Sequence, residues 1–539
     1  MSNTSSLAAN NMRPISRDER KIIFASSLGT VFEWYDFFLY GALAAIISKQ
    51  FFAGVNETTA FIFALMTFAA GFLVRPFGAL VFGRLGDLIG RKYTFLATII
   101  LMGASTFLVG LLPAYASIGI AAPISLVLLR MLQGLAIGGE YGGAAIYVAE
   151  HAPDDQRGSY TSWIQVTATG GLVLSLLVIL LCRKLTGPAF DDWGWRLPFL
   201  LSLLLLAIST WIRLSLHESP AFLRMKAEGR HSKAPIKDSF TNWQNLRIVL
   251  ISLFGINGGQ AVTFYCAQFY SLFFLTQILK VDGQTANMLL VIALLISAPL
   301  FLYFGKLSDR IGRKPVVMAG FLLAALFTFP AFKGLTLYAS PQIAHAQQTA
   351  PVTVLADPAT CHFQFDPVGK AKLESACDKA KALLAKNGIP YQQQQASQAG
   401  QTEIHIGSLT LQGFDKNALQ AGLKQAGYPE KADPAAINYP MVVLLLVVLC
   451  VFSAMTYGPL AALMVELFPT RIRYTSMSLP YHLGNGWIGG LLPTVAFSLV
   501  VYTGDILYGL WYPVIVCVMS FVVSLLALPE TRHKDIHQH

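Results

Sequence analysis

Apolar residues form long continuous blocks along the chain instead of alternating with polar residues. The clearest blocks cover residues 95–112, 172–181, 198–212, 441–455 and 511–528. With their flanks, most of them reach the roughly 20 residues that a helix needs to cross a bilayer. The pattern predicts twelve membrane-spanning helices, at residues 22–46, 60–83, 93–112, 123–148, 160–182, 197–214, 246–275, 284–305, 315–338, 440–465, 475–501 and 508–528. An even number of spans places both termini on one side of the membrane.

The composition excludes a soluble protein. Of the 539 residues, 54% are hydrophobic and only 13% are charged, whereas soluble domains carry about 25% charged residues. The net charge of +10 comes largely from basic residues in the short loops between apolar blocks, which is typical of membrane orientation rather than of nucleic-acid binding. No short apolar segment with a cleavage site precedes the first block, so we expect no signal peptide.

The basic residues also predict the orientation. The loops after the second, fourth, sixth, eighth and tenth spans, and both tails, carry lysine and arginine. The opposite short loops hold few basic residues, namely Lys49, Arg183, Lys184 and Lys280. Because basic loops stay on the cytoplasmic side, we predict a multi-pass protein of the inner membrane with both termini in the cytoplasm.

A repeat divides the chain into two halves. Residues 83–92 (GRLGDLIGRK) return as residues 305–314 (GKLSDRIGRK), each time between the second and third spans of a six-span set. Matching segments also follow the two sets, at 217–220 and 529–532. Proteins built of such repeats bind their ligand between the repeats. The predicted organisation is a tail at 1–21, a first half at 22–214, a linker at 215–245, a second half at 246–528 and a tail at 529–539.

A polar insertion at residues 339–438 divides the second half into segments 246–338 and 439–528. Residues 352–355 and 403–411 predict strands, and residues 370–386 and 415–425 predict amphipathic helices. We therefore expect a small α/β domain, on the periplasmic side. Cys361 and Cys377 both fall in this domain, and the oxidising compartment favours a disulfide between them.

Further motifs carry a family resemblance. They are residues 29–41 (GTVFEWYDFFLYG), 75–78 (RPFG), 130–140 (RMLQGLAIGGE) and 466–474 (ELFPTRIRY). Together with the repeated loops, they resemble the metabolite:proton symporter family of the major facilitator superfamily, which includes carriers for α-ketoglutarate, citrate, shikimate and proline or betaine. The resemblance implies the major facilitator fold and proton-coupled uptake. The insertion, and residues 480–482 (PYH) where relatives more often show Gly-Tyr-Asn, leave the substrate open.

Ionisable residues inside the predicted spans are functional candidates, because each costs about 2.5–3.5 kcal/mol at the membrane centre. Glu33 and Asp36 lie three residues apart in the first span, roughly 16–21 Å from its start at the helical rise. Arg130 and Glu140 line one stripe of the fourth span, and Arg75 lies in the second. In a dry cavity these arginines and carboxylates would pair and hold each other ionised.

This pairing suggests how transport is coupled to protons. A carboxylate that loses its arginine to a substrate carboxylate would take up a proton. Glu33, Asp36 and Glu140 are therefore the proton-coupling candidates, and Arg130 and Arg75 are candidates for binding the substrate. The alternative for each residue is a fixed ion pair that holds the helices together.

Polar and aromatic residues of both halves complete the candidate substrate site, because they could hold a ligand by hydrogen bonds and ring contacts. They are Tyr35, Gln133, Gln165, Gln260, Tyr265, Tyr481, His482 and Asn485. Packing between helices is the alternative for each of them, and for His482, the one titratable group of the second half among them, a proton site is a further alternative.

The repeated loops suggest a gate. The glycine that opens each copy has no Cβ, so a neighbouring helix can approach closely. The aspartate of each copy can face the N-terminus of a neighbouring helix and pair with the arginine that follows it. The family resemblance implies that these loops are latches that favour the outward-open state; the alternative is that they only set the orientation. The gating candidates are Gly83, Asp87, Arg91, Gly305, Asp309 and Arg313.

Proton-coupled uptake of an organic acid, or of a zwitterion such as proline or betaine, is the leading hypothesis, and a proton-driven antiporter that exports an amphipathic compound is the alternative. An enzyme is not expected, because the insertion shows no Ser–His–Asp signature, metal-ligand cluster or nucleotide-binding loop. We expect no cofactor, metal or nucleic-acid partner. The expected partners are the substrate, protons and the lipid bilayer, and the expected oligomeric state is a monomer.

Overall fold

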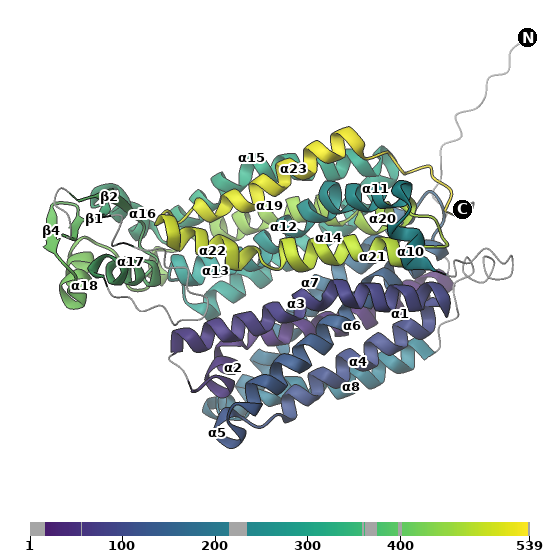
Figure 1. Ribbon diagram of the computed structural model, residues 1–539, viewed down its shortest axis with the longest axis horizontal. Coiled ribbons are helices and arrows are strands. Elements are labelled where there is room, and N and C mark those ends of the chain that lie inside the picture. Colours follow the sequence, from purple (N-terminus) through teal and green to yellow (C-terminus); the bar gives the residue numbers. More distant parts are fainter. Residues whose placement is uncertain are drawn as a thin grey trace, which may run out of the picture.

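The computed structural model describes residues 17–54, 57–214, 234–357, 361, 375–396 and 401–536. These residues form two helical bundles that lie side by side, with a small domain at one end (Figure 1). The first bundle contains α1 (Arg17–Ala42), α2 (Ala44–Phe51), α3 (Glu57–Leu88), α4 (Arg91–Leu111), α5 (Tyr115–Ile118), α6 (Ala121–His151), α7 (Arg157–Thr186) and α8 (Arg196–Leu214). The second contains α10 (Pro235–Phe240), α11 (Trp243–Ser252), α12 (Gly258–Tyr265), α13 (Ser271–Phe273), α14 (Gly283–Ile311), α15 (Arg313–Ala339), α19 (Tyr439–Tyr457), α20 (Leu460–Leu467), α21 (Arg473–Leu483), α22 (Leu492–Thr503) and α23 (Trp511–Ala527).

The helices follow the predicted spans. Among the described residues, ten helical stretches are long and apolar enough to cross a membrane, and they match the second to fifth and the seventh to twelfth predicted spans. The sixth span is α8, whose apolar stretch Arg196–Ile212 is shorter. The first span corresponds to α1 and α2. The predicted all-α membrane architecture in two halves is therefore confirmed, whereas the first 16 residues and most of the predicted linker lie outside the described residues.

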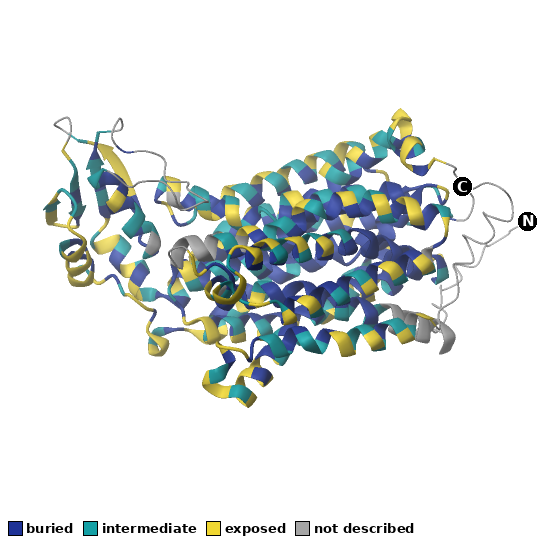
Figure 2. Cartoon of the chain, turned by 60° about the horizontal axis from the view of Figure 1, so that its bottom comes forward, coloured by how far each residue is buried: buried dark blue, intermediate teal, exposed yellow. Residues whose placement is uncertain are grey.

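Exposure follows a pattern that suits lipid surroundings. Figure 2 shows buried residues concentrated inside the bundles and exposed ones along their outer faces. Large apolar side chains lie on this outer surface, for example Leu526 at 79% and Trp211 at 76% exposure. Such exposure is unfavourable in water and costs nothing against hydrocarbon, so the outer faces of the helices fit a bilayer.

The two halves meet along two seams, where α3 packs on α21 and α7 packs on α14. Within the first half, α3 and α6 are in very close contact. A Cβ on Gly134 would lie 2.0 Å from the carbonyl oxygen of Gly71, and a Cβ on Gly138 would lie 2.3 Å from that of Arg75. The glycine-rich run of α6, residues 134–143, is therefore a surface for close helix packing.

Two of the predicted spans contain π-helical segments instead of continuous α-helix. The seventh span carries three, at Leu253–Asn257, Cys266–Tyr270 and Phe274–Ile278, and the eleventh carries one at Gly484–Gly489. These two helices pack directly on each other, since a Cβ on Gly484 would lie 2.7 Å from the Cβ of Asn257. Such π-helical turns occur often at functional sites.

The insertion forms an α/β domain. Its sheet has the order β2-β1-β3-β4, with β1 (Val352–Ala356) and β2 (Tyr391–Gln395) parallel and the other pairs antiparallel. The strand predicted at 403–411 is in fact a hairpin of β3 (Glu403–Ile406) and β4 (Leu409–Gln412), which turns at Gly407 with a φ of +56°. Its helices are α16 (Pro341–Thr349), α17 (Ala376–Lys386) and α18 (Lys416–Gln425).

A disulfide fixes the start of α17. Cys361 and Cys377 are joined, with their Cα atoms 5.5 Å apart, so the predicted disulfide is confirmed. Ser375 caps the helix by accepting a hydrogen bond from the backbone of Asp378. The predicted helix at 370–386 is thus α17 in its described part, and residues 370–374 lie outside the described residues.

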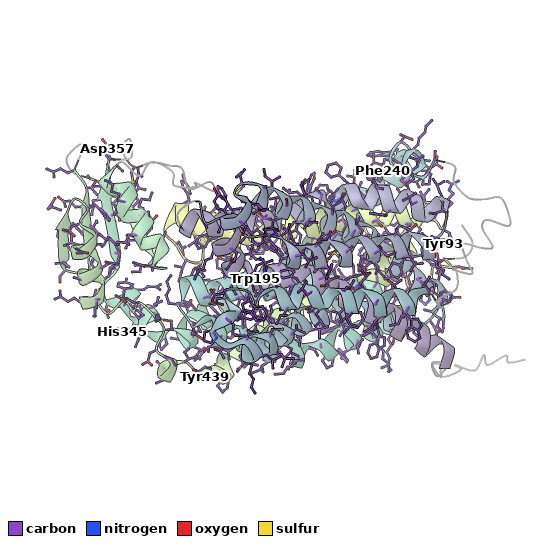
Figure 3. All side chains as sticks on the ribbon, turned by 90° about the horizontal axis from the view of Figure 1, so that it is seen from below. Tyr93, Trp195, Phe240, His345, Asp357 and Tyr439 are labelled. Atoms are coloured by element: carbon purple, nitrogen blue, oxygen red, sulfur yellow. A yellow bond between two sulfur atoms is a disulfide. The ribbon has the colours of Figure 1, made fainter. Side chains whose placement is uncertain are left out.

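The inserted domain is attached to the second half. The backbone N–H of Tyr391 donates to the carbonyl of Gly504 at 3.0 Å, and that of Ala432 donates to the carbonyl of Lys280 at 2.9 Å. Figure 3 places Asp357 and His345 of the insertion at one end of the molecule and Tyr93 and Phe240 at the other. We call these the insertion end and the termini end, because α1 begins and α23 ends at the latter (Figure 1).

Candidate functional site

The centre of α3 carries a buried arginine that makes no ion pair with any described residue. Arg75 is 0% exposed, and its guanidinium carbon lies 4.4 Å from the ring centre of Phe37, 4.6 Å from Phe72 and 5.6 Å from Trp34. None of its three side-chain nitrogens has a hydrogen-bond partner of good geometry in the described part of the chain, although the Tyr265 side chain lies nearby. The ion pair predicted for Arg75 is therefore wrong in this conformation, because aromatic faces surround the cation instead.

Arg130 of α6 is also buried without a carboxylate partner among the described residues. Its Nη1 donates to Oε1 of Gln133 at 2.5 Å, and Gln133 Nε2 donates to the hydroxyl of Thr106 at 2.7 Å. The guanidinium carbon lies 4.7 Å from the ring centre of Phe37 and 4.6 Å from that of Tyr40. Both arginines therefore approach Phe37, and Gln133 orients Arg130 rather than facing the second half.

The candidate carboxylates are all deeply buried. Glu33, Asp36 and Glu140 are 4%, 4% and 5% exposed. Asp36 accepts a hydrogen bond at 2.6 Å from the hydroxyl of Ser202 on α8. Its carboxylate thus faces the interior of the first half. The proton-coupling roles of the three residues stay predictions.

The two faces of α1 have different surroundings. Tyr35 donates a hydrogen bond to the carbonyl of Pro198 on α8 at 2.7 Å, so this candidate for binding the substrate faces α8. In contrast, Phe38 packs on Phe269 of the second half, with ring centres 5.5 Å apart. Residues 34, 37 and 38 therefore form the face of α1 that is directed toward the centre, as their spacing of three to four residues permits.

Aromatic residues also join the two halves near the centre of the molecule. Tyr141 of α6 stacks on Tyr481 of α21, with ring centres 3.6 Å apart and an angle of 5° between the rings. Gln165 Nε2 donates to the Tyr141 hydroxyl at 2.8 Å, and the hydroxyls of Tyr457 and Tyr481 share a hydrogen bond of 2.9 Å. Two of the predicted residues, Gln165 and Tyr481, thus belong to two hydrogen-bonded pairs, one in each half, which the stacked rings of Tyr141 and Tyr481 join.

The second half contributes neutral polar groups. Asn485 Nδ2 donates to Gln260 Oε1 at 3.0 Å. His482 is 0% exposed, and its ring meets that of Tyr481 edge-on at 4.9 Å. Arg75 lies close enough to His482 and to Tyr265 for its charge to act on both. The structure therefore brings Arg75 of the first half near predicted substrate-binding residues of the second.

Several polar atoms in this region lack a hydrogen-bond partner among the described residues. They are Nε, Nη1 and Nη2 of Arg75, both ring nitrogens of His482, Nε2 of Gln260 and Oε1 of Gln165. A buried polar atom without a partner costs about 1–3 kcal/mol, and such atoms are rare in proteins. The arrangement can therefore bind a small ligand that supplies both hydrogen-bond acceptors and donors.

Residues of the site that were not predicted include Trp34, Phe37, Phe72 and Tyr141. Trp34 and Phe37 lie three residues apart within the motif at 29–41, so helical spacing was a usable signal that they share one face of the helix. Tyr141 lies inside the glycine-rich run of α6, where the glycines let α21 come close enough for ring stacking. Nothing in the sequence distinguishes Phe72 from the other apolar residues of its span.

At the termini end, Asp87 joins the halves. Its Oδ2 accepts hydrogen bonds from the backbone N–H of Thr475 at 3.0 Å and from the Thr475 hydroxyl at 2.8 Å, at the start of α21. A Cβ on Gly83 would lie 3.1 Å from the Cα of Thr475. The side chain of Arg91 lies outside the described part of the structure.

Asp309 makes the corresponding contact from the second half. It accepts hydrogen bonds from the backbone N–H groups of Gly158 and Ser159 at 2.8 and 2.7 Å, at the start of α7, and it pairs with Arg313 at 2.6 Å. A Cβ on Gly305 would lie 2.5 Å from the Cβ of Ser162. Both predicted aspartate contacts with helix N-termini are present, and their gating role stays a prediction.

Further ion pairs across the halves were not predicted. Arg473 pairs with Glu150 at 2.7 Å, and Arg157 lies 3.6 Å from Glu466, which also pairs with Arg313 at 3.1 Å. The two partners of each pair are widely separated in sequence, although Glu466 and Arg473 both belong to the motif at 466–474. Together with the two aspartates they hold the halves closed at the termini end.

Comparison with known families gives two matches. The model of the family described as "Sugar (and other) transporter" matches residues 21–244 and 419–539. The model described as "MFS/sugar transport protein" matches residues 143–356.

Curated relatives are similar over more than half of the chain. The proline/betaine transporter of Salmonella typhimurium is 40% identical over 326 residues, which cover 58% of this chain and 64% of the relative. The corresponding transporter of Escherichia coli K12 is 39% identical with the same coverage. The glycine betaine/proline/ectoine/pipecolic acid transporter of Dickeya dadantii is 38% identical over 348 residues, 60% of this chain and 68% of its own. The match thus spans just under two thirds of the length of the first two relatives.

Solved structures share the fold at low sequence identity. A proton:xylose symporter of the major facilitator superfamily, bound to 6-bromo-6-deoxy-D-glucose, has a TM-score of 0.66 at 15% identity and covers 96% of this chain and 98% of that one. The inward-open xylose transporter from E. coli has a TM-score of 0.56 at 15% identity and the same coverage. The predicted major facilitator architecture is therefore confirmed.

Proposed function

The chain belongs to the sugar (and other) transporter family of the major facilitator superfamily, and from this premise we propose that it is a proton-coupled transporter of a small metabolite that carries a carboxylate. Among such metabolites we favour a zwitterion of the proline or betaine kind. Alternating access of the two halves would carry the substrate across the membrane.

The observation that supports the carboxylate is the state of Arg75. A buried guanidinium with three unpartnered nitrogens is unfavourable, and aromatic faces compensate for only part of the lost hydration. A carboxylate satisfies a guanidinium by two parallel hydrogen bonds. Arg75 also lies at the seam between the halves, since its Cβ is 3.9 Å from the position of a Cβ on Gly486 of the second half. A substrate held there contacts both halves.

The choice of a zwitterion is based on the relatives and on the rings. Relatives about 40% identical are named as proline/betaine transporters. The rings of residues 34, 37 and 72 surround Arg75, and the faces of such rings also attract the substituted ammonium group of a zwitterion. An organic acid would use Arg75 in the same way, but it would gain nothing from these rings.

Coupling to protons is proposed to involve Asp36. Its carboxylate accepts from Ser202 in this conformation, while Arg130 Nη1 lies 3.5 Å from the carbonyl oxygen of the next residue, Phe37. A protonated Asp36 can remain with Ser202, whereas an ionised one gains by turning toward the unpaired Arg130. Protonation of Asp36 would thus decide whether α1 is held by α8 or by α6. Because Phe37 lies beside both arginines, that choice would also affect Arg75.

Uptake into proteoliposomes with an imposed pH gradient tests the proposal. Proline, glycine betaine, citrate and α-ketoglutarate are offered with the external side acidic and then with the gradient reversed. Accumulation of a carboxylate compound with the proton flux supports symport, whereas accumulation against it indicates the antiport alternative. No gradient-dependent flux of any of them would overturn the proposal.

A pair of arginine variants tests the site. Arg75→Lys should lower uptake at least tenfold, because a lysine makes no bidentate contact with a carboxylate. Arg196→Lys is the matched control, since Arg196 donates to the carbonyls of Gly110 and Leu112 at 2.9 and 2.5 Å. Equal loss in the two variants would mean that Arg75 has no special role.

A further inference from the structure

The imidazole of His482 is a buried group with no described hydrogen-bond partner on either nitrogen. It is 0% exposed and lies on α21, one residue after the stacked Tyr481. A histidine that serves only to pack helices almost always satisfies at least one nitrogen. Its two unmet nitrogens therefore need a different explanation.

The position of His482 relates it to the unpaired arginine. His482 and Gly486 are four residues apart in the eleventh span, and Gly486 faces both Phe72 and Arg75 of α3. The charge of Arg75 also acts on the imidazole. Arg75 and His482 therefore border the same part of the seam from opposite halves.

The chemistry of an imidazole restricts what can satisfy it. A second cation beside the unpaired Arg75 would be costly, so the ring is neutral here. A neutral imidazole has one N–H donor and one acceptor nitrogen. A carboxylate held by Arg75 can accept from the N–H, but the other nitrogen needs an N–H or O–H group of the ligand.

We infer that His482 is a specificity-determining residue, which selects substrates that carry an N–H or O–H donor next to the carboxylate. Imino acids, amino acids and hydroxy acids meet this requirement. A fully N-methylated betaine does not, and it would leave the acceptor nitrogen unpaired. This inference rests on the proposed function, and it predicts a preference within the class of zwitterions that the rings alone would not produce.

Neighbouring groups support this division of roles. Among the described residues, Gln260 Nε2 is a donor without a partner and Gln165 Oε1 is an acceptor without a partner, and both residues are 0% exposed. They come from spans of different halves, so a ligand that bridges Arg75 and His482 would lie among groups able to complete its hydrogen bonds.

The experiment compares initial uptake rates of radiolabelled L-proline and glycine betaine by the full chain in proteoliposomes. Wild type should favour proline by at least tenfold in kcat/KM. His482→Leu should reduce that ratio at least tenfold, mainly through the KM of proline, and His482→Asn should restore most of it. His405→Leu, in β3 of the insertion where His405 contacts Glu403 at 3.3 Å, is the matched control and should leave the ratio unchanged.

The outcomes separate the two proposals. An unchanged proline-to-betaine ratio in His482→Leu, with transport retained, overturns the role of His482 and leaves the proposed function standing. Uptake of neither compound by wild type overturns the choice of zwitterion and this inference with it. If His482→Leu does not fold, as judged by its melting temperature, the comparison of His482→Asn with His482→Gln takes its place. Both amides offer a donor and an acceptor, but they reach different distances from the backbone. A proline-to-betaine ratio equal to that of wild type in both variants would refute a direct contact.

Discussion

Neutralising the two aspartates at the termini end tests whether they hold that end closed. Asp87 accepts two hydrogen bonds from Thr475, and Asp309 accepts one each from the backbones of Gly158 and Ser159. Asp87 and Asp309 are 1% and 4% exposed, and each belongs to the half opposite to the helix that it contacts. A change to asparagine keeps the size and one acceptor oxygen but removes the charge.

The expected magnitude follows from these contacts. A hydrogen bond to a charged group contributes about 1.5–3 kcal/mol and a neutral one about 0.5–1.5 kcal/mol, and attraction to a helix N-terminus adds about 0.3–1 kcal/mol. Each substitution should therefore destabilise the closed state by about 2 kcal/mol, which raises the ratio of open to closed molecules roughly thirtyfold. The contacts lie on different seams, so the effects of Asp87→Asn and Asp309→Asn should add.

Pulsed electron spin resonance measures the change directly. Spin labels on Arg84 and Lys306, which are exposed on the two halves at this end, report the separation of the halves once the four free cysteines are replaced. Asp282→Asn is the control, because Asp282 accepts from the backbones of Gln284 and Thr285 at the start of its own helix. A distance distribution that is unchanged in both variants, or that changes equally in the control, would refute the latch.

Two further substitutions probe packing and the insertion. In Gly142→Ala the new methyl would lie 2.3 Å from the Ser478 hydroxyl, so the spin-labelled halves should separate at the termini end. Gly283→Ala is the control, because nothing lies within 4 Å of the new methyl, and the distances should stay unchanged. The same spin-label measurement checks both variants, and no separation in Gly142→Ala would contradict a tight contact between α6 and α21. Replacing Cys361 and Cys377 by serine opens a loop of sequence separation 16 and should destabilise the inserted domain by about 3 kcal/mol, seen as faster hydrogen exchange in α17, while unchanged exchange would show that the disulfide adds nothing.

Local and periodic features were predictable from the sequence. The spans depend only on continuous apolar stretches, the two halves on a ten-residue repeat, and the disulfide on two cysteines in one polar insertion. Even the contacts of Asp87 and Asp309 followed from their place in that repeat. Each of these features is expressed within a short stretch of sequence, where composition and spacing carry the signal.

Features that depend on distant partners were not predictable. The strand β2 consists of Tyr391 and four glutamines, so it shows no alternation and is defined only by its pairing with β1. Of the π-helical segments, Leu253–Asn257 and Gly484–Gly489 pack on each other, although they lie more than 200 residues apart in sequence. Arg75 was expected to find a carboxylate, and its actual ring partners on α1 could be identified only once the helices were assembled.

The buried ionisable residues of this protein form two groups, those that pair with one another and those without a partner among the described residues. At the termini end Asp309, Arg313 and Glu466 satisfy one another, so closing that end requires no ligand. At the centre Arg75 and His482 have no such partners among the described residues, and each unmet group costs about 1–3 kcal/mol when water is excluded. Under the proposed function, closure around these groups is therefore more favourable with a carboxylate substrate than without it. Such a carrier would change between its two open states less readily when empty than when loaded, because the empty site would have to close with its polar groups unpaired. Fewer transitions without substrate mean less proton leakage, so the unpaired arginine would contribute to tight coupling as well as to binding.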